Sequence, residues 1–315
     1  MNITKPQNSL SKTQISIIKT LIYFDVFSYP LTLEQIHHFF QDCQIEDSII
    51  DQSLNGLCEN NIIYKIGNFY SIHNNQELVN KRIIGNKYAE KVTKKALRNA
   101  RLIGSFPYVR EVCISGSLSK GYMDESGDVD FFIITKSERL WIARTLLILY
   151  KKIFLLNSRK YFCVNYFIDE NNLEIPDKNI FTATEILTLI PTYQSTFYHQ
   201  FITKNNWAFD FLPNRIIDKN IQIVHKNTFI KTISEKLLDS KLGEKLDGLF
   251  MKLTIKKWKQ KFNYMRKEQF ELAMRSRKYV SKHHPQSFQE KVLNKITEKV
   301  NEFENRHQVK LTNND

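Results

Sequence analysis

The strongest constraint on the fold is a pair of aspartates at the start of an apolar run. Asp128 and Asp130 flank Val129, and the apolar residues 131–134 follow directly. Such a run predicts a buried strand, here over residues 129–135. Because side chains alternate along a strand, we expect both carboxylates on one face of the sheet. Two neighbouring carboxylates repel each other unless a cation lies between them, and hard oxygen ligands of this kind suit Mg²⁺.

A second apolar segment, residues 109–114, precedes this strand and is followed by Gly116 and Ser117. Glycine lets the backbone turn tightly and approach a ligand closely. A helix beginning at this turn would present its N–H groups, together with the Ser117 hydroxyl, to a phosphate. The sequence therefore predicts a phosphate cradle beside a divalent-metal platform. That combination serves in-line attack on a nucleoside triphosphate.

This order of residues, Gly-Ser followed by Asp-x-Asp on the next strand, resembles the nucleotidyltransferase superfamily typified by DNA polymerase β. The likeness is close over residues 113–135 and looser over roughly 85–190. It implies that Gly116 and Ser117 hold the β- and γ-phosphates of a nucleoside triphosphate. It implies that Asp128 and Asp130 ligate Mg²⁺, with Mn²⁺ as the alternative ion. The reaction implied is transfer of a nucleoside monophosphate with release of pyrophosphate.

Lys120 stands where relatives often have arginine, and by the resemblance it would neutralise triphosphate charge. A solvated lysine at a helix start is the alternative. The whole motif also has a plainer explanation, a tight turn followed by two surface aspartates.

The superfamily often has a third carboxylate on a neighbouring strand, which acts as general base for the attacking hydroxyl. In the predicted strand over 161–168 the mid-strand polar residue is Asn165, whose amide cannot take up a proton. Asp169 has the same strand parity and is the first candidate for a substitute, and Glu185 is the second. The absence of any third carboxylate is the remaining possibility. Asn165 also keeps open the alternative function, a catalytically silent module that binds nucleic acid or a partner protein.

Residues 1–75 are predicted to form a winged-helix-like domain, with three helices followed by two short strands around Gly67. In a DNA-binding domain of this kind the third helix would enter the major groove. From Glu46 to Asn60, however, it carries four carboxylates and no Lys or Arg. We therefore expect a packing or protein-interaction role in place of DNA binding and transcription control.

Residues 76–190 are predicted to form an α/β nucleotidyltransferase core. It is entered by a long amphipathic helix over 77–104, with Ile84 and Val92 on its apolar stripe and Arg82 on its basic face. Residues 191–315 are predicted to be mostly helical. His283 and His284 are assigned to a helix there, with a capping or surface role, because adjacent helical residues do not face one site. The predicted fold class is thus α+β, with a small mixed-sheet core between a winged-helix-like domain and a helical region.

The charge is concentrated near the end of the chain. The whole sequence has 46 Lys and Arg against 33 Asp and Glu, a net charge of +13. Residues 252–282 have 11 basic residues against 2 acidic ones. This region is expected to attract an anionic partner, although a solvated helix face has the same composition. The acceptor stays open among a protein side chain, a small molecule and an RNA end.

The four cysteines include no CxxC pair, so neither a disulfide framework nor a zinc site is expected. No signal peptide and no membrane-spanning run is visible, and Lys and Arg interrupt the most apolar stretch, residues 140–156. We therefore expect a soluble cytoplasmic protein with no membrane partner.

Overall fold

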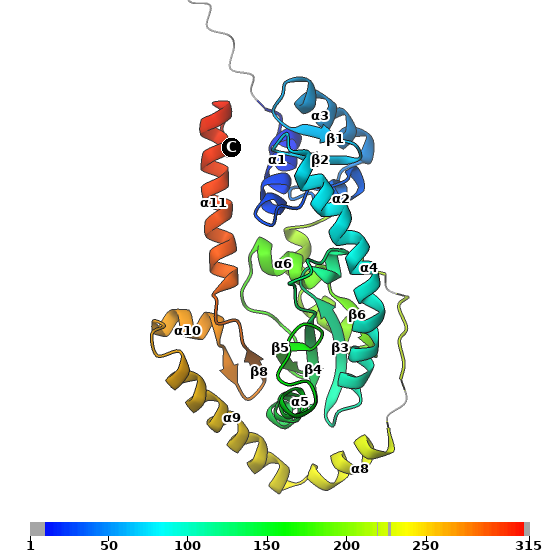
Figure 1. Cartoon of the computed structure of the whole chain (residues 1–315), viewed down its shortest axis with the longest axis vertical. Helices are drawn as coiled ribbons and strands as arrows, with labels where there is room; N and C mark the ends of the chain where they lie inside the picture. The colour runs from blue at the N-terminus through cyan, green and yellow to red at the C-terminus, as the bar shows by residue number, and fades with distance from the viewer. Residues whose placement is uncertain (1–9, 219, 226–227, 312–315) are drawn as a thin grey trace, which may run out of the picture.

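The chain is an α+β protein built around one mixed sheet with helices on both faces (Figure 1). The computed structural model describes residues 10–218, 220–225 and 228–311. None of the helices in these ranges combines the length and the apolarity that a bilayer span requires.

Three helices and a hairpin form the N-terminal unit: α1 (Lys12–Asp25), α2 (Leu33–His38), α3 (Asp47–Glu59), β1 (Tyr64–Ile66) and β2 (Phe69–Ser71). α1 and α2 each begin with a capping box, in which Ser11 or Thr32 and the glutamine three residues later bond each other's backbone N–H groups. Gly67 turns the hairpin with a φ of +58°. The predicted succession of three helices and two strands is therefore confirmed.

Six strands form the sheet in the order β6-β3-β4-β5-β8-β7. They are β3 (Val109–Ser115), β4 (Asp130–Thr135), β5 (Cys163–Asp169), β6 (Ile190–Tyr193), β7 (Ser276–Arg277) and β8 (Val280–Lys282). β4 and β5 are parallel, and the other neighbouring pairs are antiparallel. The predicted mixed sheet is confirmed.

Four helices cover the sheet: α4 (Gln76–Gly104), α5 (Leu140–Phe154), α6 (Ile180–Leu187) and α7 (Thr196–Lys204). The alternation of side chains along β4 separates two apolar cores. Phe131 and Ile133 belong to the core that contains side chains of α4 and α5. Phe132 and Ile134 belong to the other core, which contains α6, α7 and the N-terminal unit. In Figure 1 the N-terminal unit lies above the sheet and α4 runs down one side.

In its first half, the buried side of α4 is not the side that was predicted. Ile84 is 66% exposed, whereas Arg82, expected on the basic face, is buried. The guanidinium carbon of Arg82 lies 3.4 Å from the centre of the Tyr29 ring, and its Nη1 donates to the carbonyl oxygen of Pro30 at 2.8 Å. The first half of α4 thus faces the N-terminal unit, and its second half, which contains the buried Val92, packs on the sheet.

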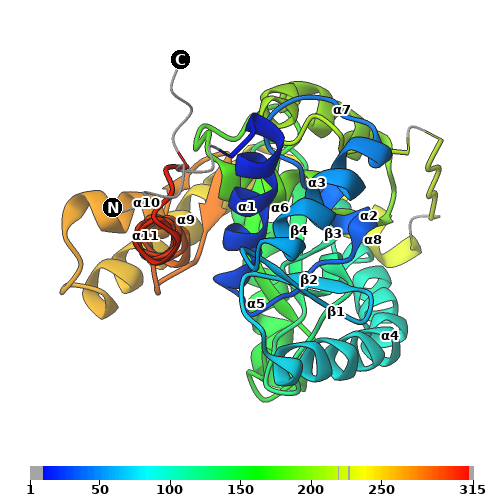
Figure 2. The same cartoon turned by 90° about the horizontal axis from the view of Figure 1, so that it is seen from above.

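The region after residue 190 is less purely helical than predicted. After α7 its helices are the short η2 (Asn206–Asp210), α8 (Phe229–Leu238), α9 (Lys241–Lys261), α10 (Lys267–Ala273) and α11 (Phe288–His307). The same region also supplies β6, β7 and β8 to the sheet. His283 and His284 directly follow β8, so they are not on a helix, and both side chains are largely buried. Seen from above, α10 and α11 lie on the side of the molecule opposite α4 (Figure 2).

Candidate functional site

A cavity of about 410 Å³ lies where the N-terminal unit, the sheet and α11 meet. Its wall is formed by the end of α1, the turn after β3, the start of β4, β5, α6, β8 and the start of α11. Much of that wall is aromatic: Phe24, Phe27, Tyr29, Tyr122, Phe132, Tyr166, Phe181, Phe201 and Phe288. Polar side chains gather at two places on it, one at the turn after β3 and one at β8.

The turn after β3 requires glycine at residue 116. Gly116 has a φ of +69°, and a Cβ built there would lie 2.8 Å from Oδ2 of Asp130. The helix predicted to start at Ser117 is one 3₁₀ turn, η1 (Leu118–Lys120), which ends at Gly121. The Ser117 side chain is exposed and lines the cavity. Gly116, Ser117 and Asp130 therefore share one wall.

Asp130 is the first residue of β4, and two residues of β5 contact its carboxylate. Nδ2 of Asn165 donates to Oδ1 of Asp130 at 3.0 Å, and Cys163 is the residue opposite Asp130 in the ladder. Burial raises the pKa of Asp130 to about 6, and the charges of Glu185 and Asp128 act in the same direction. Asp128 lies just before β4 and is close enough to affect Asp130, but it does not line the cavity.

Lys120 also lies in this group. Its Nζ is 2.8 Å from Oε1 of Glu185 and 3.0 Å from the carbonyl oxygen of Gly116. The hydroxyl of Tyr29 donates to the backbone carbonyl of Lys120 at 2.6 Å, which ties the N-terminal unit to the turn. Of the two candidates for a third carboxylate, Glu185 is therefore the one that lines the cavity.

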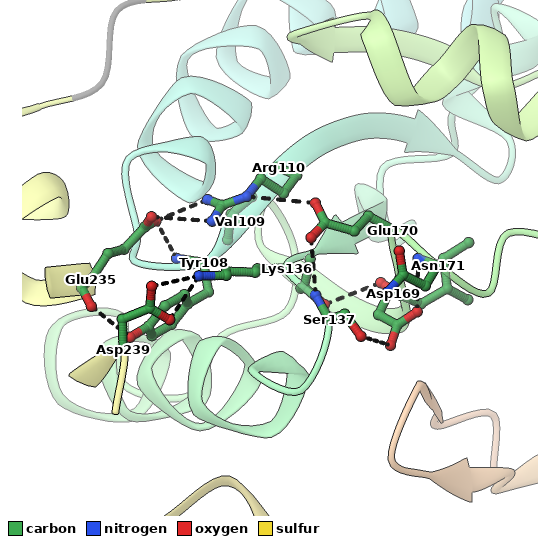
Figure 3. A network of polar contacts seen from close by, with 12 residues as sticks. Tyr108, Val109, Arg110, Lys136, Ser137, Asp169, Glu170, Asn171, Glu235 and Asp239 are labelled. Atoms are coloured by element: carbon green, nitrogen blue, oxygen red, sulfur yellow. Dashed lines mark hydrogen bonds and ion pairs between the residues drawn. The ribbon is translucent and has the colours of Figure 1, made fainter. Parts of the chain in front are cut away.

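Asp169, the first candidate for that role, lies at the other end of the sheet. In the β4–β5 register Asp130 is opposite Cys163, whereas Asp169 is opposite Thr135, about 17 Å further along at the usual rise per residue. Its carboxylate accepts hydrogen bonds from Ser137 and from the residues that follow β5 (Figure 3). The predicted equal parity of Asn165 and Asp169 is wrong, because β5 has an irregular register between Val164 and Tyr166. Both this irregularity and the extra length of strand separate Asp169 from the cavity.

The second polar group on the cavity wall was missed, because residues 191–315 were predicted to be mostly helical and strand β8 was not predicted. Lys282 in β8 is buried, and its Nζ lies 3.1 Å from Oε1 of Gln289 and 3.6 Å from Oδ2 of Asp177. Asp177 also forms two hydrogen bonds with Arg275, at 2.7 and 2.9 Å. A buried lysine in a short strand has no local sequence signal, so only the sheet reveals this group.

His284 lines the same part of the cavity. Burial, with the nearby charge of Lys282, lowers the pKa of His284 to about 4, so its imidazole is neutral at pH 7. The ring lies 6.0 Å from the Tyr166 ring, centre to centre. Neither ring nitrogen has a hydrogen-bond partner among the described residues. His284 is thus a proton acceptor on the cavity wall, and the capping or surface role predicted for it is wrong.

Mg²⁺ typically uses one or two protein carboxylates, with water and substrate phosphates completing its shell. Asp130 and the nearby Asp128 fit that requirement, because a cation beside them would offset the repulsion that contributes to the raised pKa of Asp130. Within the described ranges, no group of three or more His, Cys, Asp or Glu side chains is arranged to hold a metal ion. The residues present therefore suit a metal whose remaining ligands come from a substrate.

The chain matches no protein-family model, no curated protein and no solved structure. The case for a function therefore rests on the residues and geometry described above.

Proposed function

We propose that the chain is a Mg²⁺-dependent nucleotidyltransferase, which moves a nucleoside monophosphate from a nucleoside triphosphate to an acceptor and releases pyrophosphate. The observation that carries the proposal is the contact between the left-handed turn at Gly116 and the carboxylate of Asp130. It brings the glycine-serine turn and Asp130 to one cavity, with Asp128 just behind that wall. A chance occurrence of the two motifs would not require them to meet.

Each group has a role in binding the triphosphate. The absence of a side chain at Gly116 lets a phosphate approach the backbone, and the Ser117 hydroxyl donates to a phosphate oxygen. Lys120 exchanges its contact with Glu185 for the phosphates. Asp128 and Asp130 would hold Mg²⁺, which neutralises phosphate charge and favours attack at the α-phosphorus. The aromatic wall offers flat surfaces for a nucleobase.

In the transfer step an acceptor hydroxyl oxygen forms a bond to the α-phosphorus. The bond from that phosphorus to the oxygen bridging the α- and β-phosphates breaks, and pyrophosphate leaves. The hydroxyl proton passes to a side chain on the cavity wall. The Asn165 amide cannot accept it, whereas the Glu185 carboxylate and the neutral imidazole of His284 can.

The volume of the cavity indicates which class of acceptor it can hold. About 410 Å³ is within the range of pockets that hold small ligands, roughly 300–1,000 Å³. That size, with three parts of the chain around it, supports a small-molecule acceptor over a protein side chain or an RNA end.

One observation favours a second candidate, a module that binds a nucleotide without transferring it. Asn165 occupies the position beside Asp130 where the superfamily often has a third carboxylate, and it is hydrogen-bonded to Asp130. In such a module the cavity would bind a nucleoside triphosphate and release it unchanged.

The test is to incubate the protein with Mg²⁺, each nucleoside triphosphate labelled at the α-phosphate and a mixture of small hydroxyl compounds as acceptors. Pyrophosphate release, transfer of the label to an acceptor and nucleotide binding are then measured. We expect release with at least one nucleotide, lowered by at least about 100-fold in Asp128→Asn and in Asp130→Asn. Asp169→Asn, the same change at the far end of the sheet, should retain turnover. Turnover that survives both Asp128→Asn and Asp130→Asn would exclude this site, and binding without any release would favour the silent module.

A further inference from the structure

Helix α8 is attached to the rest of the protein by its polar face. Lys231 is only 2% exposed, and its Nζ donates to the carbonyl oxygens of Gly104 and Val109 at 2.8 and 2.6 Å. One turn later, the carboxylate of Glu235 accepts two hydrogen bonds from the guanidinium of Arg110, at 2.9 and 3.1 Å (Figure 3). These contacts fix α8 at the start of β3.

The opposite face of α8 is apolar and exposed. The exposed fractions are 79% for Phe229, 75% for Ile230, 40% for Ile233 and 72% for Leu237. At 3.6 residues per turn these four positions share one side of the helix. A surface helix ordinarily turns its apolar side inward, so α8 has the reverse orientation. A contiguous exposed apolar face of this kind marks an interaction site.

α9 begins three residues after the end of α8 and has an exposed apolar side of its own, which also carries lysines. Leu242, Leu249 and Leu253 are 60%, 48% and 56% exposed. Lys245 and Lys256 are exposed on the same side of that helix, as its periodicity places them. α8 and the first half of α9 form the lower edge of the molecule in Figure 1. This edge thus combines large apolar side chains with positive charge.

We propose that α8 and the outer side of α9 bind an anionic membrane surface. The apolar side chains enter the boundary between headgroups and acyl chains, and the lysines contact lipid phosphates. The sequence-based expectation of no membrane partner rested on the lack of a spanning segment, which a helix lying on the surface does not need.

Other occupants fit this edge less well. Nucleic acid would pair with the lysines but would leave Phe229, Ile230 and Leu237 in water. A second copy, packed edge to edge, would bring the lysine-rich sides of two α9 helices together, and like charges in contact are unfavourable. An anionic lipid surface accommodates both kinds of side chain.

The proposed membrane edge and the cavity lie at opposite ends of the sheet. α8 is fixed at the start of β3, and the cavity lies at the end of β3, about 20 Å away at the usual rise per residue. The inference uses none of the cavity residues, so it does not depend on the proposed function.

The test is flotation of the full chain with vesicles of phosphatidylcholine alone, or of equal parts of phosphatidylcholine and phosphatidylglycerol. We expect binding to the anionic vesicles only, weakened by added salt. Phe229→Ser/Leu237→Ser should lower the ratio of bound to free protein by at least about tenfold, because the apolar contribution is lost. The double variant Lys245→Gln/Lys256→Gln should lower the ratio of bound to free protein on anionic vesicles, because the contacts of these lysines with lipid phosphates are lost.

Matched controls use exposed side chains elsewhere, so that none of the variants removes a buried contact. Ile84→Ser on α4 and Lys291→Gln/Lys295→Gln on α11 should bind vesicles like the unaltered chain. Three results would overturn the proposal: no flotation with anionic vesicles, equal flotation of the α8 variant, or a stable dimer in light scattering that the α8 variant dissociates.

Discussion

At the residue scale, the chain offers a matched pair of glycines. Gly116 and Gly121 both have a positive φ, +69° and +72°, but only Gly116 has a neighbour within 4 Å of an added Cβ. We expect Gly121→Ala to cost about 1 kcal/mol of unfolding free energy, the price of a left-handed alanine. Gly116→Ala should cost more and weaken nucleotide binding, because the carboxylate of Asp130 must move. Urea unfolding and nucleotide titration of both variants measure this, and identical behaviour would show that the turn does not touch the site.

Glu111 on β3 gives the protein a pH-dependent stability. Its side chain is buried and accepts the backbone N–H of Tyr198 at 2.7 Å, and burial raises its pKa to about 8. A folded-state pKa above the unfolded one means that its stabilising contribution is complete below about pH 4 and is lost as the pH rises through about 8. The slope is at most about 1.4 kcal/mol per pH unit.

Glu111→Gln keeps the hydrogen-bond acceptor and removes the titration. We therefore expect the Tm of the unaltered chain to fall relative to that of the variant between about pH 5 and pH 8. Thermal unfolding of both proteins across that range is the measurement. All other titrating groups are common to the two proteins, so parallel curves would show that Glu111 is not protonated in the folded state.

The candidate site was predictable where its residues are close in sequence. Gly116, Ser117 and Asp130 follow from glycine geometry and strand alternation, which are local properties. Lys282 and His284 come to the cavity through pairing with β5, and their local sequence does not encode that partner. Strand parity alone could not rank Glu185 above Asp169, because the choice depends on which end of the sheet the cavity occupies.

At the element scale, the long periodic segments were predictable and the short strands were not. The helices of the N-terminal unit and the strands β3, β4 and β5 carry clear patterns. β7 and β8 are 2 and 3 residues long, too short for any periodicity to show. The error in the predicted buried side of α4 has a different cause from the missed strands. Arg82 is buried by contacts with the N-terminal unit, and these override its ordinary preference for solvent.

The attachment of α11 to α1 can be tested with one ion pair. Nζ of Lys299 lies 2.5 Å from Oδ2 of Asp25, whose side chain is 7% exposed. We expect Lys299→Gln to lower the unfolding free energy by about 1–2 kcal/mol, less than for a fully buried pair because the lysine is partly exposed. Lys295→Gln, an exposed lysine on the same helix, should change it by less than about 0.5 kcal/mol. Equal effects in urea unfolding would show that the pair contributes nothing.

At the scale of the whole molecule, one apolar core crosses the predicted boundary between residues 75 and 76. Phe24, Tyr29 and Leu31 of the N-terminal unit belong to the same buried cluster as Tyr122 and Ile186. The rings of Tyr29 and Tyr122 meet edge to face, 5.5 Å apart. The N-terminal unit therefore covers the core and also forms part of the cavity wall.

A chain of residues 76–315 should accordingly fold poorly. Its shared core would be exposed to water, so we expect dye binding to apolar surface and the loss of cooperative unfolding in calorimetry. Tyr29→Phe in the full chain is the matched control, because it removes the hydrogen bond to Lys120 and leaves the core covered. That variant should lose only about 1 kcal/mol. If the shortened chain instead unfolds cooperatively at an unchanged Tm, residues 1–75 are an independent domain. They would then complete the cavity wall only by docking on a part of the chain that folds without them.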